Sequence, residues 1–274
     1  MFICNDTLVV YPMVGITVSG TCTKYGTTPA KVSRNSRIKI AGIDDNSVYQ
    51  YISALKSPCP LPSDATLISI FMSQYFNEKA GVWDADERRK QLSSAIGSSI
   101  LAHIPLHERM EVLDFGAGTG LISAYVAPRV NKIVAVDTSE SMLAELAAKP
   151  ELRGRVEAIC VDITEKSLDK RFDLVISAMA MHHVPDTAAL IQSFADHLKP
   201  GGKLALADLD TEDGSFHPDE AAGVFHRGFD RGELQKMLEK RGFADVHFFT
   251  AHTIMKDGKE YPVFLVTATK SQAA

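Results

Sequence analysis

The chain has 274 residues, of which 45% are hydrophobic and 23% are charged, and its formal net charge is −5. This composition is typical of one large α/β domain, or of one domain with an extension. The acidic balance and the lack of a Lys/Arg cluster disfavour a nucleic-acid-binding surface, and no segment approaches the roughly 18–20 apolar residues of a membrane span.

The cysteines and the amino terminus bear on the cellular setting. The four cysteines are scattered and show neither metal-ligand spacing nor a disulfide framework; they are Cys4, Cys22, Cys59 and Cys160. The first residues lack the basic-then-apolar layout of a signal peptide. These features favour a reducing, cytoplasmic setting.

The first 71 residues differ from the rest of the chain. They hold three of the four cysteines and many Ser and Thr residues, and the Pro/Ser-rich segment 57–65 interrupts them. We expect residues 1–71 to be an upstream extension, poorly ordered or outside the natural protein, and residues 72–274 to form the functional domain. The alternative is a small β-rich appendage, because residues 8–21 alternate enough for a short hairpin.

Strands and helices alternate regularly after Met72. Helices are predicted near residues 85–103 (with Asp84 as N-cap), 119–128, 139–148, 186–198 (ended by Pro200-Gly201-Gly202) and 231–241. Strands are predicted near residues 112–115, 133–137, 156–161, 172–178, 203–208, 246–250 and 261–269. The last two strands are joined through Asp257-Gly258, a hairpin turn signal.

This alternation predicts the fold class. Repeated strand–helix units require right-handed crossovers and a parallel sheet covered on both faces. We therefore expect an α/β, doubly wound, Rossmann-like sheet of seven mostly parallel strands, with helices on both faces. The C-terminal hairpin adds an antiparallel strand. Ligands on such a sheet lie beyond the carboxyl ends of the strands, where the chain order switches.

The segment VLDFGAGTG, residues 112–120, carries the strongest chemical signal. A buried strand ends in an acid and passes into alternating glycines, which permit a tight turn and a close approach of the backbone to a ligand. The loop leads into a helix whose free N–H groups favour a polar or anionic ligand. The next strand ends in Asp137, whose carboxylate can accept both hydroxyls of a ribose. The pattern indicates a nucleoside-cofactor site.

The glycine spacing departs from the G-x-G-x-x-G of dinucleotide enzymes. It resembles the first motif of the class I S-adenosylmethionine (SAM)-dependent methyltransferases, in which Asp137 would bind the ribose. Residues 160–165 are similar to the third strand of that family, whose acid, here Asp162, reaches the adenine amino group. Residues 171–184 and 198–208 resemble its fourth and fifth strands. The resemblance covers roughly the last 200 residues.

The resemblance implies SAM as the cofactor and a set of residues that bind it. These are Asp114, Gly116, Ala117, Gly118, Gly120, Asp137, Thr138, Met142, Asp162, Ile163 and Ser177. Two of them have an ordinary structural alternative. Asp114 either orients the glycine loop or the methionine end of the cofactor, or caps nearby N–H groups. Met142 packs in the core, and its flexible thioether can also lie under the adenine.

Histidines are the candidate catalytic residues. His182 and His183 follow the fourth strand, where the methyl acceptor should approach, and a neutral imidazole can take a proton from the acceptor. A structural or substrate-shaping role is the alternative. The segment 208–230 adds His217 and His226 and is expected to form part of the acceptor pocket or a lid. Its acids also suggest a metal site, but without metal-ligand spacing a solvated loop is favoured, so no metal is predicted.

The sequence also narrows the class of acceptor. SAMAMH after the fourth strand lacks the Asn/Asp-Pro-Pro-Tyr tetrapeptide of enzymes that methylate adenine or amide nitrogens. Pyrimidine C5 and arsenic methylation need cysteines that are missing from the expected places. We expect methyl transfer to an O, N or C atom of a small-molecule metabolite, without a nucleic-acid or membrane partner; the oligomeric state is open. The alternatives are SAM chemistry other than methylation, and a non-catalytic SAM-binding protein.

Overall fold

The computed structural model describes residues 8–11, 16–19, 37–39, 64–217 and 223–272, with side chains from residue 73 onward. The chain divides into two compact units. The first comprises Met1–Ile70 and Glu220–Gly223, and the second comprises Phe71–Asp219 and Val224–Ala274. That residues 1–71 are an extension of the natural protein stays a prediction. Cys4, Cys22 and Cys59 lie outside the described residues.

The first unit contains a three-stranded antiparallel sheet. Its strands are β1 (Leu8–Tyr11), β2 (Ile16–Ser19) and β3 (Arg37–Lys39), in the order β1-β2-β3. Strands β1 and β2 pair as the hairpin that the alternating pattern of residues 8–21 indicated.

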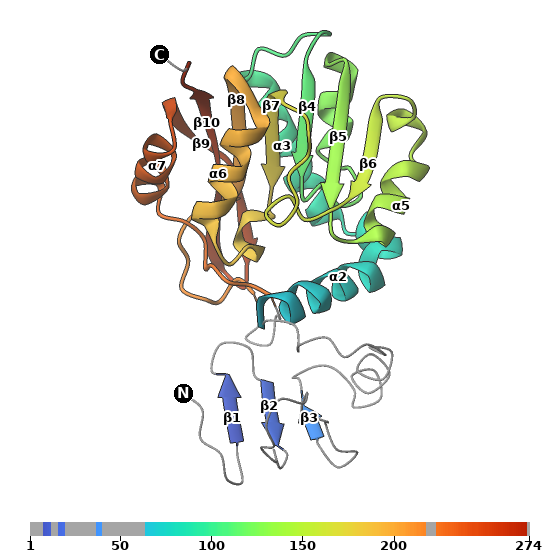
Figure 1. Ribbon diagram of the computed structural model, residues 1–274, viewed down its shortest axis with the longest axis vertical. Coiled ribbons are helices and arrows are strands. Elements are labelled where there is room, and N and C mark those ends of the chain that lie inside the picture. Colours follow the sequence, from blue (N-terminus) through green and yellow to red (C-terminus); the bar gives the residue numbers. More distant parts are fainter. Residues whose placement is uncertain (1–7, 12–15, 20–36, 40–63, 218–222, 273–274) are drawn as a thin grey trace, which may run out of the picture. The chain divides into compact units, whose positions relative to one another are not determined.

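The second unit is built on a seven-stranded sheet (Figure 1). The strands are β4 (Glu111–Phe115), β5 (Lys132–Asp137), β6 (Val156–Cys160), β7 (Phe172–Ala178), β8 (Leu198–Leu209), β9 (Phe243–Lys256) and β10 (Lys259–Lys270). They lie in the order β6-β5-β4-β7-β8-β10-β9, with the first five parallel and β10 antiparallel to both of its neighbours. The predicted fold class is confirmed. The chain order switches between β4 and β7, where ligands bind in such sheets.

The described helices are α2 (Asp64–Trp83), α3 (Glu87–His103), α4 (Ser123–Val126), α5 (Glu140–Ala148), α6 (Thr187–His197) and α7 (Arg231–Lys240), with short 3₁₀ turns η1 (Ala127–Arg129), η2 (Pro150–Leu152) and η3 (Met181–His183). Helices α3 to α7 cover the two faces of the sheet. One hydrophobic core joins the sheet to α3, α4 and α5, and the other joins it to α6 and α7. Successive residues of β4 enter opposite cores, Val112 the first and Leu113 the second, because side chains alternate across a strand.

Three local predictions were wrong. Asp86, not Asp84, caps α3, and its carboxylate accepts a hydrogen bond from the Arg88 N–H at 2.9 Å. The predicted helix at 119–128 is reduced to α4 and η1, because the glycine loop continues to the start of α4. Pro200-Gly201-Gly202 lies inside β8, where the pairing with β7 shifts register and so accommodates a residue without an N–H donor.

The C-terminal hairpin is longer than predicted, but its turn is confirmed. Asp257 and Gly258 join β9 to β10 with φ angles of 52° and 76°, the left-handed pair that a two-residue hairpin turn requires. None of the described helices combines the length and the apolar character needed to cross a bilayer.

Candidate functional site

The glycine loop follows β4 at the switch point of the sheet. Gly116, Gly118 and Gly120 have φ angles of 64°, 53° and 81°, which side-chain-bearing residues rarely adopt. A Cβ on Gly116 would lie 2.4 Å from the Ala180 Cβ, whereas a Cβ on Gly118 would meet nothing within 4 Å. The Ala117 N–H donates to the Val136 carbonyl at 3.1 Å. The loop is thus fixed on the sheet and leaves open space beside Gly118.

Asp137 ends β5 and faces this loop. Its Oδ2 accepts a hydrogen bond from the Gly118 N–H at 2.8 Å, and its Oδ1 accepts one from the Ser139 N–H at 2.9 Å. Burial raises the pKa of Asp137, and these backbone donors oppose the rise. The two carboxylate oxygens together offer about four acceptor positions, so the group retains capacity to accept a hydrogen bond from a ligand hydroxyl.

Asp114 lies behind the loop rather than within it. Its carboxyl group is 2% exposed and accepts a hydrogen bond from the Ser123 hydroxyl in α4 at 2.6 Å. Burial raises the pKa of Asp114 to about 7, although the Ser123 bond opposes this. The contact joins the end of β4 to the helix after the loop through a side-chain hydroxyl rather than through a capped backbone N–H. The role of Asp114 toward a cofactor stays a prediction.

The remaining predicted cofactor residues surround the same edge of the sheet. The Asp162 Oδ1 accepts bonds from the N–H and the hydroxyl of Thr164, at 2.8 and 2.6 Å, which leaves Oδ2 for a ligand. Ile163 and Met142 are buried, and Thr138 is half-buried next to Asp137. The Ser177 hydroxyl is buried without a hydrogen-bond partner among the described residues.

The second group of site residues follows β7 and β8. His182 lies on η3, is 2% exposed, and places its Nδ1 2.8 Å from Oδ1 of Asp208, a fully buried residue of β8. The Asp208 carboxylate also accepts bonds from the backbone N–H groups of His182 and Leu209, at 3.2 and 2.8 Å. When the His182 Nδ1–H donates to this carboxylate, Nε2 is the nitrogen of the ring that can accept a proton.

The structure brings three of the four predicted histidines together. The His182 ring centroid is 4.1 Å from that of His183 and 5.1 Å from that of His217. Burial, followed by repulsion from His182, lowers the pKa of His217 to about 4, so this ring is neutral at neutral pH. Its Nε2 is buried and finds no hydrogen-bond partner in the part of the chain that the structure describes.

His226 is held apart from this histidine cluster (His182, His183 and His217). Its Nε2 lies 2.9 Å from the Val184 carbonyl and 3.0 Å from the Thr187 hydroxyl. The carbonyl accepts the ring proton, so this nitrogen secures the start of α6. Within the described ranges, no group of His, Cys, Asp and Glu side chains could hold a metal ion.

Helix α2 supplies residues that the sequence reasoning missed. Asn77 and Asp84 hydrogen-bond to the segments that follow β5 and β4, and the ring of Phe76 lies 5.4 Å from that of His183. The only signal in the sequence was the aromatic residues and the Trp83-Asp84 pair, which mark the segment without showing what it contacts.

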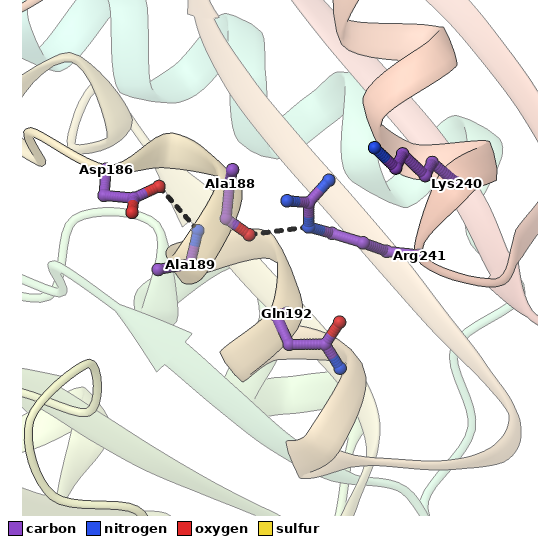
Figure 2. Close-up of a pocket in the computed structure, with 6 residues that line it drawn as sticks. All are labelled: Asp186, Ala188, Ala189, Gln192, Lys240 and Arg241. Atoms are coloured by element: carbon purple, nitrogen blue, oxygen red, sulfur yellow. Dashed lines mark hydrogen bonds between the residues drawn. The ribbon is translucent and has the colours of Figure 1, made fainter.

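A shallow pocket lies elsewhere, between α6 and the end of α7 (Figure 2). Its volume is about 400 Å³, and its lining contains none of the predicted site residues. The Arg241 Nε donates to the Ala188 carbonyl at 2.6 Å, and Asp186 accepts from the Ala189 N–H at 2.8 Å. Asp186 and Arg241 therefore both bind the backbone at the start of α6, and we assign the pocket no role.

Comparison with known proteins agrees with this geometry. Residues 112–202 match a family model described as a methyltransferase domain. An uncharacterised methyltransferase of Schizosaccharomyces pombe is 36% identical over 135 residues, which cover 43% of this chain and 48% of that protein. Phosphoethanolamine N-methyltransferase 3 of Arabidopsis thaliana is 32% identical over 149 residues, covering 52% of this chain and 30% of that protein. The chain thus spans about half the length of these curated relatives, or less.

Solved structures show the same fold. The DhpI–SAH complex aligns with a TM-score of 0.61 and 20% identity, covering 76% of this chain and 98% of that one. At this level of identity, the likeness establishes the architecture alone.

Proposed function

We propose that the chain is a class I SAM-dependent methyltransferase, which binds SAM and transfers the methyl group to an O, N or C atom of a small molecule. The match of residues 112–202 to a methyltransferase-domain family model supports this proposal. The observation that carries the proposal is the pairing of the glycine loop with Asp137. A carboxylate at the end of β5 binds the backbone of an open loop after β4 and retains free lone pairs.

The described residues fit such a cofactor. Asp137 would accept the ribose hydroxyls, and the open space beside Gly118 would admit the ligand close to the backbone. Asp162 keeps Oδ2 for the adenine amino group, next to the buried Ile163. The Ser177 hydroxyl lacks a partner at the end of β7, so a bound ligand would relieve an unsatisfied buried group.

The chemistry divides between cofactor and protein. SAM supplies a methyl group that its sulfonium has already activated. The protein then has to hold the acceptor in line and exclude water, so that proximity and orientation supply most of the acceleration. Where the acceptor atom carries a proton, we assign its removal to the His182 Nε2, with Asp208 holding the ring in the required tautomer.

His217 and His183 have a different proposed role. Because His217 is neutral and its Nε2 is unpartnered, it can hydrogen-bond to an acceptor without adding charge. His183 and Phe76 contribute ring surface beside it. We do not extend a catalytic role to His226, whose Nε2 already binds the backbone.

A small-molecule acceptor is supported by two observations. The net charge of −5 does not suit a polyanionic partner. In addition, a matched relative is named for phosphoethanolamine, a small molecule.

The test is methyl transfer from SAM carrying a labelled methyl group. The full chain is incubated with a small-molecule extract, and labelled products are separated by chromatography and mass spectrometry. We expect label in a small product with wild type and with Glu157→Gln, which removes an exposed acid of β6. At SAM concentrations near the wild-type Kd, Asp137→Ala should form several-fold less labelled product, because its affinity for SAM is lower. If SAM is bound and consumed without a methylated product, the alternative of non-methylating SAM chemistry replaces this proposal.

A further inference from the structure

Helix α2 meets the cofactor segments through two separate polar contacts. From Phe71 onward it belongs to the same unit as the seven-stranded sheet, and there it runs along the edge where the parallel strands end (Figure 1). Ordinary surface helices present their polar side chains to water. This helix instead directs an amide and the following Asp84 at the two segments that form the proposed cofactor site.

The first contact reaches the glycine loop. The Asp84 Oδ1 accepts a hydrogen bond from the Thr119 hydroxyl at 2.6 Å, and its Oδ2 pairs with the Lys149 ammonium at 2.6 Å. Thr119 lies between Gly118 and Gly120 and is 2% exposed. One carboxylate therefore joins the glycine loop to the residue that follows α5. A bond to a charged acceptor at a buried hydroxyl is among the stronger hydrogen bonds in proteins.

The second contact reaches the segment after Asp137. The Asn77 Oδ1 accepts bonds from the Ser139 hydroxyl at 2.7 Å and from the Ser141 N–H at 3.0 Å. Ser139 is fully buried, and its N–H donates to the Asp137 Oδ1 at 2.9 Å. Asn77 is thus two hydrogen bonds away from the carboxylate that we assign to the ribose.

The residue before Asn77 contacts the histidine cluster. Phe76, next to Asn77, stands edge-on to His183 with a centroid distance of 5.4 Å and edge-on to Trp83 at 5.6 Å. When α2 is docked by Asn77 and Asp84, it therefore also places an aromatic wall beside His183.

We infer that Asn77 and Asp84 are positioning residues for the cofactor, because they dock α2 on the segments after β5 and β4 and thereby couple the docked helix to the bound cofactor. The inference rests on the proposed function and names a new part of the same site. If the cofactor favours the docked helix, the docked helix must favour the cofactor by the same factor. Loss of either contact lowers cofactor affinity even though neither side chain belongs to the predicted cofactor set.

The test uses S-adenosylhomocysteine (SAH) as the probe and the full chain in every case. Variants Asn77→Ala and Asp84→Ala remove the contacts, and Asp84→Asn keeps an acceptor for Thr119 while removing the charge that pairs with Lys149. The matched control is Gln74→Ala, on the same helix, whose side chain among the described residues hydrogen-bonds to Glu78 of α2. Calorimetry measures the Kd, and trypsin cleavage after the exposed Lys79 reports whether α2 is docked.

We expect SAH to slow cleavage after Lys79 several-fold in wild type and Gln74→Ala. Asn77→Ala and Asp84→Ala should raise the SAH Kd by roughly threefold to tenfold, the range for one or two hydrogen bonds, and should weaken the protection. Asp84→Asn should fall between wild type and Asp84→Ala. Circular dichroism identifies any variant that fails to fold. The slowing of cleavage after Lys79 by SAH is measured in wild type, so this part of the test does not depend on whether a variant folds.

Two results would overturn the inference. The first leaves the proposed function standing, and the second contradicts it as well. If wild type binds SAH but the ligand leaves cleavage after Lys79 unchanged, and the two alanine variants bind SAH with wild-type affinity, then α2 is a structural helix and the proposed function stands. If well-folded wild type does not bind SAH, the proposed function itself fails, and this inference fails with it.

Discussion

The two parts of the site, for which we propose cofactor binding (the cofactor side) and acceptor binding (the acceptor side), are built differently. After β4 and β5, the shape depends on backbone: glycines with positive φ, and N–H groups that bind Asp137. After β7 and β8, it depends on buried side chains from distant segments, such as His182 with Asp208. Backbone geometry restricts which residue can occupy a position, so it produces a recognisable sequence pattern. Side-chain pairs across strands produce a weaker pattern, because many residue pairs can fill the same space.

The largest effect is expected where the two sides touch, at Gly116. Gly116→Ala should destabilise the fold by roughly 2–4 kcal/mol, because a Cβ there would overlap Ala180 and the φ of 64° is unfavourable for alanine. Gly118→Ala is the matched control, with a similar φ and no atom within 4 Å of the new Cβ, and should cost about 1–2 kcal/mol. Urea unfolding of both variants measures the difference. Equal losses would show that the contact with Ala180 does not matter.

A substitution of Asp208 should change stability without changing SAH binding, which distinguishes the two sides of the site. Asp208→Asn should destabilise the fold by about 2–3 kcal/mol, because an amide replaces a buried carboxylate that accepts three hydrogen bonds. The variant should still bind SAH as wild type does, since Asp208 lies on the acceptor side. Thermal unfolding and calorimetry on the same sample test both parts. A large loss of SAH affinity with intact stability would place Asp208 in the cofactor site.

A smaller effect is expected from the pH dependence of Asp114. Its pKa is raised from 3.8 to about 7, so the folded state binds more protons than the unfolded state between those values. The stability of wild type should therefore fall, through this group, as pH rises from about 4 to 7. Asp114→Asn should remove that fall and gain roughly 1–3 kcal/mol relative to wild type at pH 8. Urea unfolding from pH 4 to 8 measures it, and parallel curves for the two proteins would contradict the assignment.

The smallest effect is expected at His217. Its pKa is lowered from 6.5 to about 4, so the unfolded state binds more protons between these values, and stability is lost as pH falls through that window. His217→Asn should make the melting temperature less sensitive to pH between 7 and 4. His226→Asn serves as the comparison, because it removes an imidazole that lies outside the histidine cluster and binds the Val184 carbonyl. The same pH response in wild type and His217→Asn would show that folding does not lower the pKa of His217.

The difference between backbone-built and side-chain-built parts of the site also explains which site features could be predicted from the sequence. The three glycines and Asp137 were identified from spacing, because a tight turn and a ligand-facing carboxylate need those residue types in that order. The pairing of His182 with Asp208 was not, since it depends on the register that sets Ala178 opposite Ala207.

Helix ends and loops show the same limit. Asp84 was expected to cap a helix and instead contacts Thr119 and Lys149. Its local sequence suits either role, and the position of α2 decides between them. The sequence Pro200-Gly201-Gly202 is likewise typical of a turn, and the pairing of its strand with β7 could not be predicted from it.

The most direct test of the account is a calorimetric titration of the full chain with SAH, alongside Asp137→Ala and Glu157→Gln. We expect wild type and Glu157→Gln to bind equally, and Asp137→Ala to bind more weakly by roughly 1–3 kcal/mol, because the ribose hydroxyls lose their charged acceptor. If well-folded wild type shows no binding, or if Asp137→Ala binds as wild type does, the glycine loop and Asp137 do not form a SAM site.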